Sequence, residues 1–275
     1  MRAARGAALL LVLWLVLLLS GLVAGYALSA RIASLQGNGL ARDMVAGEAA
    51  RAGVEYAASR LLDPDPARRW AVDGRTYRWV FDGVPVDVAV RDEAAKLDLN
   101  GAPFGLLQAF FVALGEPDEA AARLAGAVVD WRDADSLVQP AGGAEDADYA
   151  AAGLQGGAKD APFERVAELA EVLGMRPALY AAAAPHLTVY TGRAMPDAAS
   201  ADPLLRRAMG LPPSEAAADA AASPASGSGT YSIESRARPA DGRSARWSVV
   251  IRLGGDGLPG STYTTLDARR GGSAP

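Results

Sequence analysis

The hydrophobic pattern of the N-terminal quarter predicts one long helix. An uncharged, mostly apolar run extends from Gly6 to Ala30, and about 20 such residues are enough for a helix to cross a bilayer. Beyond it, Ala41 to Leu62 keeps apolar residues near helical spacing, with Arg and Glu between them. We expect a helix that lies half in the membrane and half on a globular head, weakened at residues 37–39 and ended by Pro64. Its predicted packing face consists of Met44, Val45, Ala49, Val54, Ala57, Ala58 and Leu61.

Alternating apolar and polar residues predict β-strands in two separate places. Thr76–Phe81 and Val84–Val90 flank Asp82-Gly83, which is a strong hairpin signal. Pro85 predicts that the second strand lies at an edge or pairs only beyond the proline. Strand patterns return near the C-terminus at Tyr231–Ala237, Trp247–Leu253 and Tyr263–Leu266.

Between these strands the period is helical, from Asn100 to about Ala184. The order helix, strands, helical block, strands is best explained by an α+β head with a helical insertion. We expect a poorly ordered linker with one short helix over residues 197–229, which are rich in Ala, Pro, Ser and Asp. The predicted helices of the block cover residues 102–114, from 117 past 131, 162–174 and 177–184, followed by a short strand at 187–190.

The charges around the first apolar run predict its orientation. Arg2 and Arg5 precede the run and the next charge is Arg31, so the short N-terminal side stays in the cytoplasm and the rest lies outside it. The alternative is a secretory signal peptide cut near residues 27–29. The sequence there is a mediocre cleavage motif, which favours a retained single-pass anchor.

Composition narrows the possible chemistry. The 275 residues include no cysteine and one histidine, which excludes disulfides and thiolate metal sites. We interpret His186 as a structural or surface residue rather than a catalytic one. The net charge of −5 argues against nucleic-acid binding. The chain contains no nucleophile elbow, P-loop or zinc-protease motif, and we interpret Gly254–Gly257 as a tight turn rather than a nucleotide site.

An acidic segment is the strongest candidate for a functional site. It holds six carboxylates and one arginine, so its net charge is −5. This value equals the net charge of the whole chain. Mutual repulsion would be costly without a counter-ion, and Ca²⁺ prefers such hard oxygen ligands. The segment is not an EF-hand, because Val138 and Ala144 occupy the positions of its glycine and glutamate. The six carboxylates are Asp130, Asp133, Asp135, Glu145, Asp146 and Asp148.

Residue spacing leaves two interpretations of this segment equally open. Asp133 with Asp135, and Glu145 with Asp148, could each supply two oxygens to one calcium ion; Asp130 and Asp146 are weaker candidates. Alternatively, the segment is a solvated acidic loop, which is the usual fate of such runs. A pair of carboxylates acting as acid and base is less plausible, because six clustered carboxylates indicate metal or solvent more than a glycosidase cleft.

The helical block also resembles helix-hairpin-helix units, some of which bind DNA through backbone N–H groups. The resemblance lies in residues 97–100 with Gly115, and in residues 173–175. However, the first hairpin contains Glu116, Pro117 and Asp118, so it lacks one N–H group and repels phosphate. We therefore expect the shape without DNA binding.

Taken together, several segments resemble the K-type minor pseudopilins of type II secretion systems (general secretion pathway protein K). The match runs in order from the N-terminus to about Thr191. The most specific segments are Asp-Trp-Arg-Asp and Gly-Ala-Glu-Asp. The matching segments are residues 5–10 with the membrane helix, 92–100, 129–135, 143–149, 162–163 and 168–169.

This resemblance implies a processing route and partners. Prepilin peptidase would cut between Gly6 and Ala7 and Ala7 would be N-methylated, leaving the apolar run as an anchor in the bacterial inner membrane with a periplasmic head. The fifth mature residue is Leu11, where most pilin-like proteins carry glutamate; the K-type family shares this departure, which suits a subunit at the filament tip. The implied partners are the I- and J-type minor pseudopilins, and the acidic segment matches the family's calcium-binding region.

The expected architecture is α+β: a long transmembrane and amphipathic helix and a pseudopilin-like antiparallel sheet with a large all-α insertion of helix-hairpin-helix or SAM-like type. We expect a structural tip subunit without enzymatic activity; the alternative is a stand-alone anchored protein that binds calcium or hydrolyses a substrate through the acidic segment. The expected divisions are 1–6 (leader), 7–30 (transmembrane helix), 31–66 (periplasmic helix), 67–96 (first strands), 97–190 (helical insertion), 191–229 (linker) and 230–275 (returning strands and tail).

Overall fold

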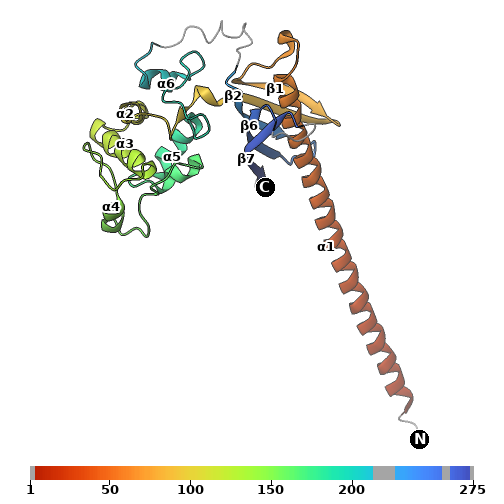
Figure 1. The fold of residues 1–275 in the computed structure, drawn as a ribbon. Helices are drawn as coiled ribbons and strands as arrows, with labels where there is room; N and C mark the ends of the chain where they lie inside the picture. Colours follow the sequence, from red (N-terminus) through yellow and green to blue (C-terminus); the bar gives the residue numbers. More distant parts are fainter. Residues whose placement is uncertain (1–3, 213–226, 256–260, 273–275) are drawn as a thin grey trace.

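The computed structural model describes residues 4–212, 227–255 and 261–272, and its most extended element is helix α1, Ala4–Leu61 (Figure 1). At 1.5 Å per residue its 58 residues span about 87 Å. Leu9–Ile32 is long and apolar enough to cross a membrane, with a mean hydropathy of 2.5 and none of its residues buried. The backbone remains helical through residues 37–39, so the expected weakening there does not interrupt α1.

The second half of α1 packs on the head through small side chains. Met44 and Val45, which we expected on the packing face, are instead 65% and 55% exposed, because the covered part of α1 begins at Ala46. Gly53 also lies on this face: a Cβ atom there would lie 2.2 Å from Ser235 Oγ. The buried residues of this face are Ala46, Ala49, Ala50, Val54, Ala57 and Ala58.

The head is a five-stranded antiparallel sheet in the order β1-β2-β5-β6-β7. Strand β5 is central and pairs with β2, so strands from the two ends of the chain lie side by side. The predicted hairpin is confirmed, with Asp82 and Gly83 at positive φ in its turn. The strands are β1 (Asp73–Phe81), β2 (Val84–Asp92), β5 (Thr230–Ala237), β6 (Ala245–Leu253) and β7 (Tyr263–Gly272).

Pro85 limits how β2 pairs. The β2–β5 ladder begins at Val86, which pairs with Ala237, and Arg238 N donates a hydrogen bond to Pro85 O. Because proline has no N–H group to return that bond, the ladder ends there. The prediction that pairing starts only beyond the proline is confirmed for the β2–β5 ladder, but it is wrong for β1, which pairs with Pro85 and Val84, and β2 lies inside the sheet.

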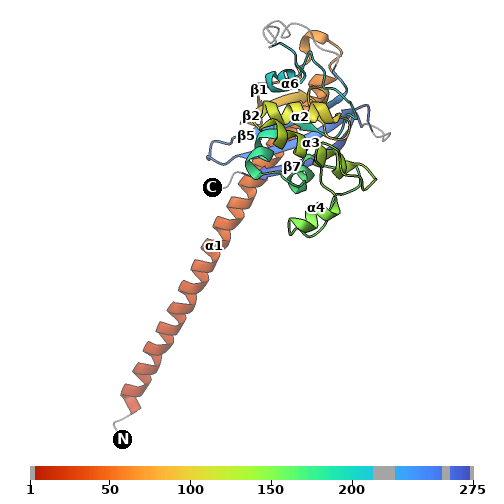
Figure 2. The same ribbon diagram turned by 90° about the vertical axis from the view of Figure 1, so that its left-hand side faces the viewer.

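Helix α1 covers one face of the sheet and leaves the other uncovered by helices (Figures 1 and 2). The covered face contributes valines and isoleucines that are at most 4% exposed, whereas Asp87 and Ala89, which alternate with the valines of β2, are partly exposed. This one-sided burial is typical of antiparallel sheets. The buried residues of the covered face include Val86, Val88, Val90, Ile233, Val249 and Ile251.

A helical domain lies beside the sheet, opposite the long arm of α1 in Figure 1. Its core is built around Phe110, Phe111 and Leu169, all of which are fully buried. The two-residue strands β3 (Leu97–Asp98) and β4 (Leu187–Thr188) pair in parallel where the chain enters and leaves the domain. Its helices are α2 (Phe104–Ala113), α3 (Asp118–Arg132), α4 (Asp146–Ala151), α5 (Pro177–Ala183) and α6 (Pro203–Ala208).

Two predictions in this domain are wrong in part. The expected helix at 162–174 is a 3-10 helix, Val166–Glu171, because Phe163 forms two hydrogen bonds with the side chain of Asn100. The Glu168 carboxylate also accepts the N–H groups of Glu164 and Arg165. These bonds hold the residues before Val166 in an extended conformation and the rest of the segment in a tight 3-10 turn.

The strand expected at 187–190 is also shorter than predicted, since it spans only Leu187–Thr188.

The segment predicted to be a linker contains structure that belongs to the helical domain. Leu205 of α6 is fully buried and Ala201 is 8% exposed, and both lie in the domain core. Asp202 caps α6 by accepting the N–H groups of Leu204 and Leu205. The short helix is therefore confirmed but packs on the domain, and the rest of the linker, residues 213–226, lies outside the described residues.

The close approach of α1 to the sheet gives a first prediction. We expect Gly53→Ala to destabilise the protein by about 1–3 kcal/mol, because the added methyl group overpacks the interface. Besides Ser235 Oγ, it would meet methyl groups of Val86 and Val88 at 2.9 and 3.1 Å. Chemical denaturation of the detergent-solubilised protein measures this change.

Gly105→Ala is the matched control, since Gly105 is also helical and a Cβ atom there would meet nothing within 4 Å. It should leave stability unchanged or raise it by roughly 0.5–1 kcal/mol through helix propensity. Equal stabilities of the two variants would contradict the close-packing argument.

Candidate metal centre

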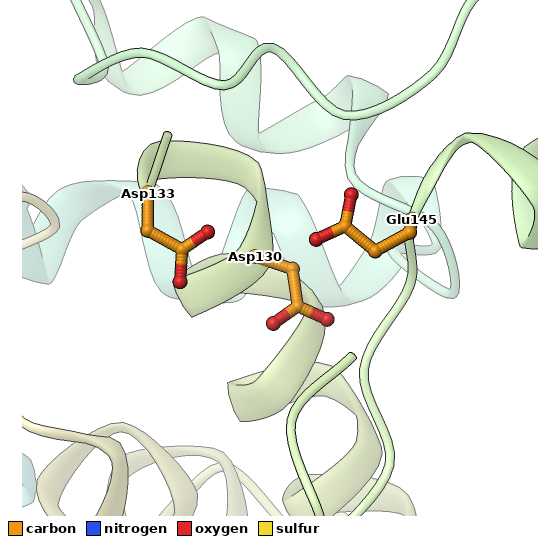
Figure 3. Close-up of side chains that lie close together, drawn as sticks. All are labelled: Asp130, Asp133 and Glu145. Atoms are coloured by element: carbon orange, nitrogen blue, oxygen red, sulfur yellow. The ribbon is translucent and has the colours of Figure 1, made fainter. Parts of the chain in front are cut away.

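Three carboxylates meet at the C-terminal end of α3. Asp130 lies in its last turn, Asp133 follows the helix in an extended conformation, and Glu145 precedes α4. One oxygen of each side chain lies within 4.8 Å of the others. Figure 3 shows Asp133 and Glu145 approaching from opposite sides of the helix end, with Asp130 below them.

Glycines let the loop between α3 and α4 fold back tightly over this helix end. A Cβ atom on Gly126 would lie 1.8 Å from Gly142 O, and one on Gly143 would lie 1.9 Å from Asp130 Oδ2. Gly142 has a φ of +97°, which other residues rarely adopt. The loop backbone therefore reaches Asp130 only because these positions lack side chains.

Hydrogen bonds satisfy one side of the cluster and leave the other open. Asp130 Oδ2 accepts the N–H group of Ala144 at 2.8 Å and that of Gln139 at 3.4 Å. Its Oδ1, together with Asp133 Oδ1 and Glu145 Oε1, is buried and has no hydrogen-bond partner among the described residues. Three unpartnered anionic oxygens in one place indicate a site for a cation.

The electrostatics of the cluster are unfavourable without a cation. Burial raises the pKa of Asp130, and Asp135 raises it further, although the two backbone donors oppose the shift. Burial also raises the pKa of Asp133 and of Glu145, with further increases from neighbouring carboxylates. The folded chain therefore disfavours all three negative charges.

The nearest arginine in the sequence only partly offsets this charge. Arg132 donates to the backbone oxygens of Leu99 and Ala102, and desolvation by burial lowers its pKa. Its positive charge lowers the pKa of Asp133, but burial and the neighbouring carboxylates raise that pKa by more. Arg132 therefore ties α3 to the start of the domain and does not remove the repulsion between the carboxylates.

An aromatic wall holds the cluster on one side. Trp131 stacks on Phe163 with 6.0 Å between ring centroids and lies 6.2 Å from Tyr149. The hydroxyl of Tyr149 accepts the N–H group of Leu173 at 3.0 Å. These contacts fix the last turn of α3 against α4 and reduce access of water to the carboxylates.

The structure brings together only two of the four residues predicted first as calcium ligands. Asp133 and Glu145 come together, whereas Asp135 accepts the N–H group of Leu137 and Asp148 accepts that of Glu145. Asp130, a weaker candidate in the sequence, belongs to the group and is fully buried. Asp146 is exposed on α4, so the segment is not one continuous loop.

The helical phase of α3 was the signal that could have identified Asp130. Residues three apart lie on the same face of a helix, so Asp130 and Asp133 project from the same side of the helix end. The spacing of carboxylates within the loop alone does not reveal this relation, because Asp130 belongs to the helix.

The donor set consists of oxygen ligands, which hard cations such as Ca²⁺ prefer. Ca²⁺ takes six to eight oxygen ligands at 2.3–2.6 Å, including carboxylates and waters. Three carboxylates from a helix end and a flexible loop supply such oxygens, and the chain has no cysteine. Asp130, Asp133 and Glu145 are therefore the residues that fit a hard cation.

His186 has a structural role in the part of the chain that the structure describes. Its Nδ1 contacts Oδ2 of Asp202, the residue that caps α6. Burial raises the pKa of Asp202, but this contact and the backbone donors of α6 outweigh it, so the pKa is lowered. Its ring also lies edge-on to Phe110. The contacts join α6 to the end of α5, as expected for a structural histidine.

Comparisons with known proteins agree with this fold. Residues 88–192 match the family model "Type II secretion system (T2SS), protein K". The chain is similar to a chain in the crystal structure of the GspK-GspI-GspJ complex from the enterotoxigenic Escherichia coli Type 2 Secretion System, with TM-score 0.62 and 18% identity, covering 88% of this chain and 100% of that one. No curated protein matches the sequence. The predicted α+β fold with an N-terminal helix is confirmed.

The raised carboxyl pKa values predict how stability depends on pH in a chelator. A raised pKa means that the folded chain binds more protons than the unfolded chain. Its stabilising effect is complete below the ordinary carboxyl pKa of about 4 and is lost as the pH rises through the raised pKa. We expect Asp130→Asn, which keeps an acceptor for Ala144, to reduce this loss, as measured by unfolding from pH 4 towards neutrality.

Asp82→Asn serves as the control for this series, because Asp82 is exposed in the β1–β2 turn. It should leave the pH profile of the wild-type protein unchanged. Parallel profiles for the wild-type and Asp130→Asn proteins would show that the cluster carries no electrostatic strain.

Proposed function

Because residues 88–192 form a domain of the type II secretion system protein K family, we propose that this chain is a structural minor pseudopilin at the tip of the secretion pseudopilus. In this role it initiates filament assembly for protein export across the outer membrane and has no enzymatic activity. The observation that carries the proposal is the joint occurrence of the family domain, the apolar N-terminal helix and the sheet packed on that helix.

The proposed partners are the I- and J-type minor pseudopilins. The similar solved chain comes from a complex named for GspK, GspI and GspJ. At 18% identity this likeness concerns the fold, so the assembly of this chain with such partners is part of the proposal. The chain spans the full length of that relative, which supports a comparable arrangement of parts.

The proposed location is the bacterial inner membrane, with the head in the periplasm. The span Leu9–Ile32 has no buried residues, as a lipid-facing helix requires, and α1 continues directly into the head. Arg2 and Arg5 precede the span, which favours a cytoplasmic N-terminus. Prepilin peptidase would cut between Gly6 and Ala7, followed by N-methylation of Ala7.

Leu11 supports a position at the end of the filament. A carboxylate at this depth is expensive unless it meets a cation, and in pilin-like subunits that cation is a neighbour's N-terminal amine. Leu11 is 69% exposed and apolar, so it needs no such neighbour. At the end of a filament no further subunit supplies an amine, so leucine at this position avoids an unpaired buried charge.

Calcium completes the proposal. The three carboxylates of Asp130, Asp133 and Glu145 would hold the ion, with backbone oxygens of the loop and water completing its coordination. The bound ion would neutralise their repulsion and fix the loop between α3 and α4. Its role here is to stabilise the helical domain rather than to activate a substrate.

Processing of the N-terminus tests the membrane part of the proposal. We expect mass spectrometry to find a mature chain that begins at Ala7 when a prepilin peptidase is co-expressed and an uncut chain when it is absent. Cleavage between Gly6 and Ala7 removes only the leader, so the apolar run stays in the mature chain as its anchor. A start near residue 30, or an uncut chain in both samples, would contradict a pilin-like subunit.

Calcium binding tests the metal part. Calcium at one hundred times its dissociation constant should stabilise the folded chain by about 2.7 kcal/mol, measured as a shift in thermal unfolding. Asp133→Asn and Glu145→Gln should abolish the shift. Asp135→Asn should retain it, because Asp135 lies outside the group of three; loss of the shift in all variants alike would reject this ligand set.

A further inference from the structure

The uncovered face of the sheet carries a regular arrangement of arginines and carboxylates. We define the arginine face as Arg78, Asp87, Glu234, Arg236, Arg238 and Arg246, which come from β1, β2, β5, β6 and the residue after β5. The strand register places them on one side: Arg78 pairs with Asp87, Asp87 with Arg236, and Arg236 with Arg246. This side is opposite the valines that α1 covers.

Each carboxylate of this face lies between two arginines. Asp87 is 2.8 Å from Arg238 and 3.9 Å from Arg78. Glu234 contacts Arg246 and lies 3.7 Å from Arg236. Four arginines thus share two carboxylates, which leaves an excess of two positive charges in a chain whose net charge is −5.

The arginine face is accessible and hollowed. The side chain of Arg78 is 91% exposed and that of Arg238 58%. Two hollows of about 120 and 630 Å³ meet here, and both are lined by Arg236 and Arg238. Among the described residues, hydrogen bonds from the region of the helical domain reach this side at the other end of the strands, where Arg252 donates to Tyr190 O and Lys96 donates to Ser232 Oγ.

The orientation of the sheet determines what can reach this face. Helix α1 lies flat on the opposite side, so the arginine face points sideways from the helix axis (Figures 1 and 2). If α1 crosses the membrane, this face looks along the membrane plane rather than down onto it. A protein anchored beside the chain can therefore meet the face, whereas the lipid surface below cannot do so without a large tilt.

From these observations we infer that the arginine face is a docking surface for an acidic, carboxylate-rich head surface of a neighbouring pilin-like subunit. Arginine forms paired hydrogen bonds with carboxylates. Carboxylates of the neighbouring subunit would balance the two positive charges that Asp87 and Glu234 do not neutralise. The inference rests on the proposed function, since it names the surface through which that assembly forms.

Site-specific cross-linking tests this surface in the full-length chain. A photo-reactive residue replaces Ser248 or Ala89, which are partly exposed on the same sheet face, in cells that also produce the I- and J-type subunits of the same organism. Ala182, exposed on α5, is the control position. We expect a covalent product with one of the two subunits from Ser248 or Ala89 and none from Ala182.

Charge variants then test the chemistry. Arg236→Gln with Arg238→Gln should weaken the cross-link about fivefold, since exposed ion pairs contribute modestly, and the corresponding Arg→Glu pair should weaken it further. Arg68→Glu is the matched control, because Arg68 is 69% exposed in an ion pair away from this face. Unchanged thermal unfolding shows that the variants remain folded.

The outcomes separate this inference from the proposed function. If the three subunits co-purify but the cross-link is absent from the arginine face, or is insensitive to the charge variants, the inference is wrong and the function stands. If the products are with phospholipid, the face binds membrane and the inference is also wrong. If no complex forms at all, both the proposed function and the inference fail.

Discussion

The close contact between α1 and the sheet is the constraint on which the other parts depend. Alanines and Gly53 on the helix let the strands approach until Ser235, Val86 and Val88 touch the helix backbone. Large side chains would hold the two layers apart. The same contact therefore fixes which sheet face is buried, which face is open, and how the head is oriented on its long apolar helix.

The helical domain is attached to this frame where the chain crosses between the two parts. Glu93 is 1% exposed and pairs with Lys96, whose amine also reaches Ser232 on β5. Asp98 accepts three hydrogen bonds from Thr191 and Gly192, at the other end of the insertion. Buried carboxylates are tolerated here because each has partners. The domain can thus be large without loosening the sheet that it interrupts.

Local signals in the sequence predicted most of the fold, and contacts between distant residues account for the differences. The Asp82-Gly83 hairpin, the faces of α3 and the apolar span follow from neighbouring residues alone. The segment after Pro162 has helical periodicity, but Asn100, more than sixty residues away, binds Phe163 and prevents an α-helix. Asp130 was undervalued for the related reason that its role depends on a loop folding back through Gly142 and Gly143. Met44 and Val45 have the right spacing for burial but stay exposed, because they line an open hollow with Phe81 and Val84 of the β1–β2 hairpin.

The helical domain and the sheet each contain a group of like charges that has too few partners of opposite sign nearby. Three buried carboxylates with unpartnered oxygens lie in the helical domain, while four arginines share two carboxylates on the sheet. These groups cannot neutralise one another, because the first cluster lies at the end of α3 and the second covers the outer side of β1, β2, β5 and β6. In both places, a charge of opposite sign from outside would relieve the imbalance. A small cation suits the enclosed carboxylates, and a broad carboxylate-bearing surface suits the open arginines, so the proposed calcium site and the proposed docking surface rest on the same physical argument.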